Sequence, residues 1–222
     1  MVAAALPVVL ITGFDAFDGD TLNPSWLAAQ ALHGRRIAGH KLVAAQLPTV
    51  FRDSLDVLRA LLRAHRPALV LCLGQAGGRA ALSLERVAIN INDARIADNA
   101  KAQPVDTPVV PGAPAAYFAT LPIKAIVAAL RSAGLPASVS QSAGTYVCNH
   151  VFYGLMHALR RRRGVRAGFM HLPLLPEQVA ARETVPAPPS LPLTTLVFGV
   201  RLALATAVTT TADLRASGGA ET

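Results

Sequence analysis

The sequence has few cysteines, few aromatic residues and few charges. Of its 222 residues only Cys72 and Cys148 are cysteines, 5% are aromatic and 15% are charged. The two cysteines could form one disulfide, but in a chain without an export signal we expect both to be reduced. Histidines and cysteines show no spacing typical of zinc ligands. We therefore expect neither a disulfide nor a metal site.

Long apolar runs and a targeting segment are also missing. No stretch of 18 or more apolar residues is free of charge, which argues against a transmembrane helix. The N-terminus lacks a positively charged region and runs directly into the strand-like segment Val8–Ile11. These absences predict a cytoplasmic protein that does not interact with membranes.

The charge is strongly positive, with a formal net value of +8. Most of the excess is scattered, and the one dense run is Arg160–Arg163. Cations at the end of a predicted helix complement its negative terminus, which favours a structural role for this run. No basic motif interleaved with aromatic residues is present. We expect no nucleic-acid partner, although a basic nucleic-acid-binding module remains an alternative.

Strand-like and helical segments alternate along the chain, which predicts a single α/β layer domain over residues 1–212. Residues 213–222 are expected to form a disordered tail. A Pro/Asp/Asn-rich connection from Asp93 to Pro114 has no periodicity and is expected to be functional or mobile. Strands are expected at Val8–Thr12, Lys41–Gln46, Ala68–Leu73, Arg86–Ile91, Ala137–Gln141 and Ala167–His171. Helices are expected at Ser25–Leu32, Arg52–His65, Ala116–Ala133, Thr145–Arg163 and Leu191 to about Thr209.

The segment around Cys148 is the best candidate for chemistry. Gly144 and Thr145 predict a turn and an N-cap, and the apolar periodicity that follows predicts a helix. The positive end of a helix dipole favours a thiolate and lowers the pKa of a cysteine. Taken alone, Cys148 is still better explained as a small buried apolar residue.

Two other residues complete a catalytic arrangement with Cys148. One helix and one strand separate it from His171, so both are expected at the same edge of the sheet, where His171 can act as general base. His150 is a rival base, but two residues along a helix it points away from Cys148. Glu85 is the only carboxylate at the start of a predicted apolar strand, and it can orient the base. Its alternative role is a strand-edge charge paired with Arg86.

The joint order and spacing of the segments that contain these residues are specific for one family. Cys148 lies in Gly-Thr-Tyr-Val-Cys-Asn-His, Glu85 in Leu-Glu-Arg-Val-Ala-Ile-Asn, and His171 precedes Leu-Pro-Leu-Leu-Pro-Glu-Gln. Together they resemble the pyroglutamyl peptidase I (pyrrolidone-carboxylate peptidase) family, in one colinear order over roughly residues 8–210. The resemblance also takes in Ile11–Phe14, Asn23–Ser25, Leu47–Phe51, Gly74–Arg79 and Asp93–Ile96.

This resemblance implies a cysteine peptidase that removes N-terminal pyroglutamate from peptides without a metal or organic cofactor. It implies that Cys148 is the nucleophile, His171 the base and Glu85 the residue that orients the base. Arg95 matches a family arginine implicated in stabilising developing negative charge. The implied fold is an α/β/α sandwich with a mixed, mostly parallel twisted sheet, and the implied assembly is a homodimer or homotetramer. The residues implied to line the pyroglutamyl pocket are Phe14, Phe17, Gln75, Ile96, Tyr146 and Val147.

The implied pocket suits a flat, uncharged lactam. Aromatic walls from Phe14 and Phe17 and amide groups such as Gln75 would bind it, and burying the ammonium of an ordinary N-terminus would be costly. One departure from the family is Asp18, where the family usually has glycine. A nucleoside-phosphorylase-like enzyme, which shares the broad sandwich architecture, remains an alternative within enzymes.

Overall fold

The computed structural model describes residues 6–182 and 184–219, which form alternating strands and helices. None of the helices in these ranges is both long and apolar enough to cross a membrane. In chain order the elements are β1 (Val8–Phe14), α1 (Pro24–Ala31), β2 (Arg36–Ile37), β3 (His40–Leu47), α2 (Phe51–His65), β4 (Leu69–Gln75), β5 (Leu82–Glu85), β6 (Val87–Ile89), β7 (Ala116–Phe118), α3 (Ile123–Ser132), β8 (Ala137–Ser140), α4 (Val147–Leu159), β9 (Arg166–Leu172), α5 (Pro176–Ala180) and α6 (Leu193–Thr209).

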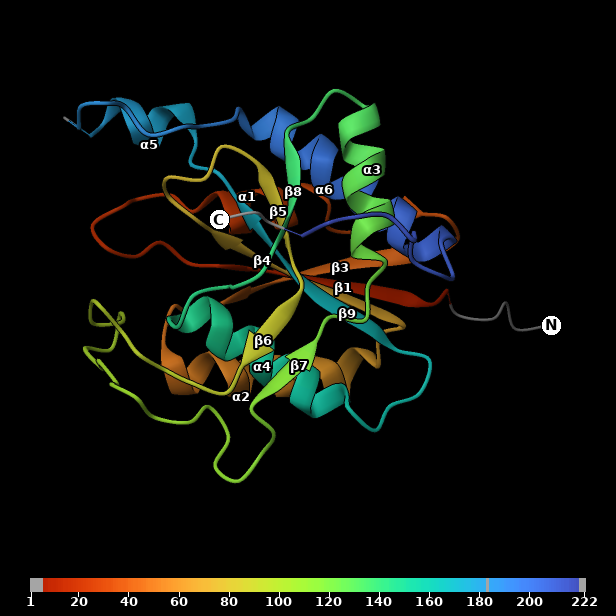
Figure 1. The fold of residues 1–222 in the computed structure, drawn as a ribbon, viewed down its shortest axis with the longest axis horizontal. Coiled ribbons are helices and arrows are strands. Elements are labelled where there is room, and N and C mark those ends of the chain that lie inside the picture. Colours follow the sequence, from red (N-terminus) through yellow and green to blue (C-terminus); the bar gives the residue numbers. More distant parts are fainter. Residues whose placement is uncertain (1–5, 183, 220–222) are drawn as a thin grey trace.

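A seven-stranded mixed sheet forms the middle layer, in the order β2-β3-β1-β4-β9-β5-β8. The pairs β1–β3, β1–β4, β4–β9 and β5–β8 are parallel, whereas β2–β3 and β5–β9 are antiparallel. Helices α3 and α6 lie on one face and α2 and α4 on the other (Figure 1). The predicted α/β/α sandwich with a mostly parallel sheet is confirmed.

The central strands are apolar on both faces because helices cover both faces. In β4 every residue from Leu69 to Gly74 is buried, and in β9 every residue from Ala167 to Leu172 is buried. Such a continuous run is typical of a parallel strand that is covered on both sides. Because β1, β4 and β9 run parallel, the segments that follow them meet at one edge of the sheet, where ligand sites of open α/β folds lie.

The largest differences from the prediction concern two of the expected elements, while α4 is shorter than the expected helix Thr145–Arg163, and β2 and α5 were not expected. The expected helix Ala116–Ala133 is the short strand β7 followed by α3, because Pro122 cannot lie inside a helix and instead caps α3. The expected strand Arg86–Ile91 is only β6, and β5 precedes it. β6 and β7 pair as a separate two-stranded sheet. Glu85 therefore ends a strand instead of starting one.

The expected disordered tail is in contact with the domain over its described part. The carboxylate of Asp213 accepts hydrogen bonds from the backbone N–H groups of Lys124 (3.2 Å) and Ala125 (2.9 Å) in the first turn of α3. The carbonyl of Gly218 accepts one from Arg86 at 2.9 Å. Polar composition suggested disorder, but these long-range contacts give residues 213–219 a defined course. Residues 220–222 of the tail and residues 1–5 of the predicted domain lie outside the described residues.

Candidate active site

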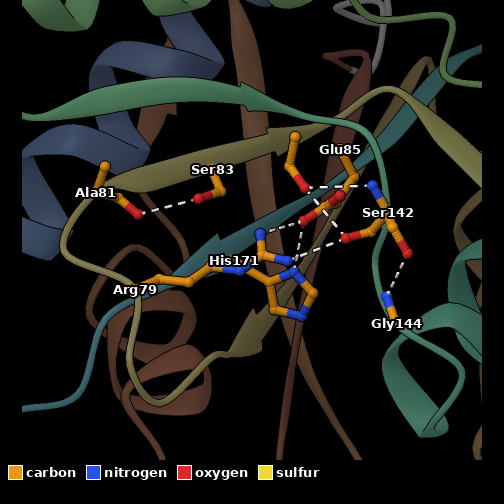
Figure 2. A network of polar contacts seen from close by, with 8 residues as sticks. Arg79, Ala81, Ser83, Glu85, Ser142, Gly144 and His171 are labelled. Carbon is orange, nitrogen blue, oxygen red and sulfur yellow. Dashed lines mark hydrogen bonds and ion pairs between the residues drawn. The ribbon is translucent and has the colours of Figure 1, made fainter. Parts of the chain in front are cut away.

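Glu85 and His171 form a buried pair on neighbouring strands (Figure 2). Glu85 ends β5, and His171 lies near the end of β9 opposite Ser83, so the two are diagonal neighbours across an antiparallel pair. His171 Nδ1 lies 2.7 Å from Glu85 Oε1, and the two residues are 3% and 0% exposed. A carboxylate can only accept, so Nδ1 carries the proton and Nε2 is the nitrogen that can take one up.

Arg79 binds the same carboxylate oxygen, a contact that the sequence did not predict. Its Nη1 lies 2.7 Å from Glu85 Oε1, and its Nη2 donates to the carbonyl of Ser142 at 3.0 Å (Figure 2). The alternative reading of Glu85, a strand-edge pair with Arg86, is wrong, because Arg86 donates to Gly218 instead. The signal that could have found Arg79 is a lone cation closing a glycine-rich segment six residues before Glu85.

Cys148 is brought beside this pair by the packing of α4 on the sheet. It is half-buried in the first turn of α4. Gly74 of β4 is the register partner of His171, and a Cβ on Gly74 would lie only 2.8 Å from Cys148 Sγ. The thiol is therefore in close contact with the backbone of the strand next to His171. Only a residue without a side chain fits between the sheet and the thiol at this point.

The pKa values of Cys148 and His171 are shifted mainly by burial. Burial raises the pKa of the Cys148 thiol to about 12, the charge of Glu85 adds to the rise and Arg79 opposes it. Burial lowers the pKa of His171, and its hydrogen bond to Glu85 opposes that shift. At neutral pH the resting pair is thus a neutral thiol and a neutral imidazole. The net direction is opposite to the lowering expected from the helix start, because desolvation of the buried thiol is the largest cause of the shift.

The beginning of α4 is open to an anion. Tyr146 is the N-cap residue and no side chain caps the helix. The predicted cap, Thr145, instead donates its hydroxyl to the carbonyl of Asp93 at 2.7 Å. The first-turn N–H groups beside Cys148 are therefore not used by a capping side chain, and with the helix dipole they favour negative charge.

A cavity of about 420 Å³ lies at the entry to α4, where Thr145 and Tyr146 line it, and most of the predicted pocket residues also line its wall. Of the predicted residues, Phe17, Gln75, Arg95, Ile96 and Tyr146 line it. The remaining lining residues are Asp18, Asp20, Gly77, Asp93, Thr145 and Arg182.

Two predicted pocket residues are not part of this cavity wall. Phe14 and Val147 are only 2% and 1% exposed, and both pack in the core between the sheet, α2 and α4. Their apolar character is explained by this packing. The sequence alone could not show that Phe17 lines the cavity whereas Phe14, three positions earlier, packs in the core.

A polar network holds Gln75 in the cavity wall. Its Nε2 donates to Asp20 Oδ2 at 3.0 Å, and its Oε1 accepts from Gln178 at 3.0 Å. Arg182 forms a two-point ion pair with Asp20 at 2.9 and 2.7 Å. Asp20 and Arg182 were not among the predicted site residues, and Gln178 appeared only as the last residue of the segment that follows His171. The network fixes the orientation of the Gln75 amide before any ligand binds.

The segment with Arg95 and Ile96 is fastened to the entry of α4. Asp93 and Thr145 exchange two hydrogen bonds, from Asp93 N to Thr145 O (3.0 Å) and from Thr145 Oγ1 to Asp93 O (2.7 Å). The hydroxyl of Tyr146 donates to the carbonyl of Ala97 at 3.1 Å. These bonds place the near half of the Asp93–Pro114 connection over the cavity, as a wall tied to the segment that leads to Cys148.

The backbone conformation at Asp18 explains how this position can depart from the glycine implied by the family resemblance. Its φ of +55° lies in the left-handed region, where glycine carries no steric penalty and aspartate is tolerated. Gly19 follows with a φ of +79°. The turn thus retains a backbone suited to glycine while an exposed carboxylate is added to the rim of the cavity.

Comparisons with known proteins show the family to which the chain belongs. A family model described as pyroglutamyl peptidase matches residues 8–210. This chain belongs to the pyroglutamyl peptidase family. It is 59% identical over 216 residues to a pyrrolidone-carboxylate peptidase of Cupriavidus taiwanensis, covering 96% of this chain and 99% of the relative. It is similar to the crystal structure of pyroglutamyl peptidase I from Bacillus amyloliquefaciens, with a TM-score of 0.91 and 45% identity over 96% of this chain and 100% of that one.

The family match spans the whole constellation described above, from β1 to the end of α6. Pyroglutamyl peptidase is an enzyme family, and neither the nucleoside-phosphorylase-like nor the nucleic-acid-binding alternative is supported. Among residues 6–182 and 184–219, no group of three or more His, Cys, Asp or Glu side chains is placed to hold a metal ion.

Proposed function

We propose that this chain is a cysteine omega-peptidase that removes N-terminal pyroglutamate from peptides, with Cys148 as nucleophile, His171 as base and Glu85 as the residue that orients His171. The observation that supports it best is the buried Glu85–His171 hydrogen bond of 2.7 Å. His171 lies on β9, and Cys148 contacts Gly74 of the neighbouring strand β4. A nucleophile, a base and an orienting carboxylate are the minimum that covalent catalysis by a thiol requires.

In the first half-reaction the Cys148 sulfur bonds to the pyroglutamyl carbonyl carbon while its proton moves to His171 Nε2. Glu85 stabilises the resulting imidazolium through Nδ1–H. The first-turn N–H groups of α4, together with Arg95, bind the oxyanion. The C–N bond then breaks, the leaving amine takes the proton from Nε2, and a thioester remains.

In the second half-reaction a water molecule hydrolyses the thioester. It gives one proton to His171 Nε2 while its oxygen bonds to the carbonyl carbon. The C–S bond then breaks, and the sulfur regains the proton, so the free thiol and pyroglutamate are released. His171 is thus base in each attack and acid in each breakdown.

The cavity is suited to a lactam at one end and to a peptide beyond it. The rings of Phe17 and Tyr146 lie 6.1 Å apart between centroids and supply aromatic walls. The fixed amide of Gln75 offers complementary hydrogen bonds. An ordinary N-terminal ammonium would have to be desolvated against this aromatic pair at a cost of several kcal/mol.

We also propose that the protein is cytoplasmic, forms a homodimer or homotetramer and has no nucleic-acid partner. Phe118 and Val105 are 69% and 63% exposed, and burial of these side chains would favour self-association. Arg160, the first residue of the arginine run, donates to the carbonyl of His157 at the end of α4, which supports a structural role. Light scattering after gel filtration tests the assembly, and a monomer at micromolar concentration would contradict it.

The test of the activity compares pyroglutamyl and prolyl amides of the same fluorogenic amine. The two substrates share a five-membered ring, but the prolyl group has a cationic nitrogen and no lactam oxygen. We expect hydrolysis of the pyroglutamyl amide and a preference of at least about 10³-fold in kcat/KM, because the buried polar groups would be left unpaired by the prolyl ring. No turnover of the pyroglutamyl amide, or equal turnover of both, would contradict the proposed function.

A further inference from the structure

Within residues 6–182 and 184–219, Arg79 is the one charged residue in contact with Glu85 that the proposed mechanism does not use. It comes from the connection between β4 and β5, and its side chain is 31% exposed, whereas that of Glu85 is fully buried. One side of its guanidinium binds Glu85 Oε1, the same oxygen that accepts from His171. The other side binds the carbonyl of Ser142, in the segment that leads into α4.

The charges around His171 balance only when Arg79 is included. The charged or titratable groups that act on His171 are Glu85 from β5 and Arg79 from the β4–β5 connection, and the same two groups act on Cys148 of α4, together with Cys72 of β4. Glu85 Oε2 is buried and has no hydrogen-bond partner among the described residues. While the thiol and imidazole are neutral, Arg79 is therefore the cation that compensates the buried carboxylate.

We propose that Arg79 is a positioning residue of the catalytic centre, which compensates the buried Glu85 carboxylate and holds it on His171 so that His171 can take the proton of Cys148. This inference rests on the proposed roles of Cys148, His171 and Glu85. Arg79 also ties the loop before α4 to the end of β5, so it sets both the charge and the position of the groups that face the thiol.

Removal of Arg79 has a definite electrostatic consequence. The buried carboxylate would then draw a proton from solvent, either onto His171 or onto itself, because an uncompensated buried charge is costly. If His171 is protonated, it cannot accept the proton of the thiol. If Glu85 is protonated, it no longer stabilises the imidazolium. In both cases the centre becomes active only at higher pH.

The experiment measures two pH profiles, that of kcat/KM for a pyroglutamyl amide and that of inactivation by iodoacetamide. In the wild type the acid limb reports His171, whose pKa is lowered from 6.5 by burial and by Arg79, so activity is retained down to a pH below 6.5 and is lost as the pH falls further. For Arg79→Met we expect both midpoints to move up by about one pH unit and kcat/KM at neutral pH to fall at least about tenfold.

Two matched variants separate charge from simple loss of a contact. Arg79→Lys keeps the cation but not the second donor, and its midpoint should lie within a few tenths of a unit of the wild-type value. Arg59→Gln removes an arginine from an exposed ion pair with Asp56 and should shift neither profile. Unchanged midpoints in Arg79→Met, with a loss of thermal stability alone, would overturn the proposal.

Chemical rescue gives a readout that does not depend on the stability of the methionine variant. In Arg79→Ala, millimolar ethylguanidinium should restore part of the lost activity and return the midpoint toward the wild-type value, because the Arg79 site is partly exposed. Ethylammonium chloride at the same concentration should restore less, since it cannot donate to Glu85 and Ser142 together. Equal responses to both salts would contradict a directed role.

The two proposals fail in different ways. If the wild type does not hydrolyse the pyroglutamyl amide, the proposed function is wrong, while the iodoacetamide profile still reports how Arg79 acts on the thiol. If the wild type is active and both profiles are insensitive to Arg79, only the role of Arg79 is wrong.

Discussion

The two cysteines of this chain have similarly shifted thiol pKa values but different neighbouring groups. Cys72 is in the middle of β4, fully buried between Thr12 of β1 and Phe169 of β9. Cys148 is half-buried in the first turn of α4, against Gly74 of the same strand. Burial raises the pKa of each thiol to about 12. The acidity of the isolated thiol therefore does not distinguish the nucleophile from the core residue.

The difference lies in neighbours and access. The charges of Glu85 and Arg79 act on Cys148, which lies at an uncapped helix start, and the two residues just before Val147, Thr145 and Tyr146, line a cavity. Cys72 has the hydroxyl of Thr12 and apolar side chains. In the proposed mechanism the buried Cys148 thiol becomes a nucleophile through a base that takes its proton during the reaction, not through a permanently lowered pKa.

The largest effect should come from removing the Cys148 thiol. We expect Cys148→Ala to lower kcat/KM for a pyroglutamyl amide by at least about 10⁴-fold, because no other group can form the thioester. Circular dichroism and the melting temperature should stay close to wild type, since Cys148 is only half-buried. If Cys148→Ala remained active, a covalent mechanism through this residue would be excluded.

Glu85→Gln should come next in size. The amide keeps the shape of the side chain but cannot balance the imidazolium or pair with Arg79, and we expect about a 10³-fold loss in kcat/KM. Glu177→Gln, at an exposed position in α5, is the matched control and should leave kcat/KM unchanged. Equal kinetics for the two variants would show that the buried pair has no part in catalysis.

Gly74→Ala tests the contact between β4 and Cys148. The new Cβ would lie 2.8 Å from Cys148 Sγ and 2.7 Å from the Phe169 ring, so the thiol must shift. We expect a 10- to 100-fold loss of kcat/KM, since small misplacements of a reacting atom cost that much. Gly168→Ala also creates a close contact, with the Leu121 side chain at 2.8 Å, and controls for strain in the core. Similar kinetics per folded molecule in both variants would refute the positional argument.

The smallest effect on catalysis should come from Cys72→Ala. Loss of the buried sulfur should lower the free energy of unfolding by about 1–2 kcal/mol, measured by urea denaturation, through lost packing. The value of kcat/KM should stay within about twofold of wild type. A large catalytic loss without a change in stability would mean that the comparison assigns the wrong cysteine to the core.

The proposed catalytic residues could be named from the sequence because their positions follow from topology. One helix and one strand follow Cys148, and they return the chain at His171 to the same edge of the sheet. This order of helix and strand can be predicted from the periodicity of apolar residues. Glu85 was found as a carboxylate beside an apolar segment, although the strand it ends, β5, is only four residues long and pairs antiparallel with β9. Periodicity cannot reveal so short a strand or its direction.

What could not be predicted depends on contacts between distant segments. Arg79 and Glu85 are close in sequence, but their pairing with His171 requires three segments to meet. The burial of Phe14 and Val147 and the network of Asp20 with Gln178 likewise depend on packing. The thiol pKa was predicted in the wrong direction, because the helix start is visible in the sequence and the depth of burial is not.

The most direct test is iodoacetamide labelling of the native enzyme followed by peptide mapping of both cysteines. The account predicts that carbamidomethylation of Cys148 proceeds in parallel with loss of pyroglutamyl amidase activity, that 5-oxoproline slows both, and that Cys72 stays unmodified until the protein is unfolded. Modification of Cys72 in step with inactivation, or full modification of Cys148 in an enzyme that remains active, would contradict it.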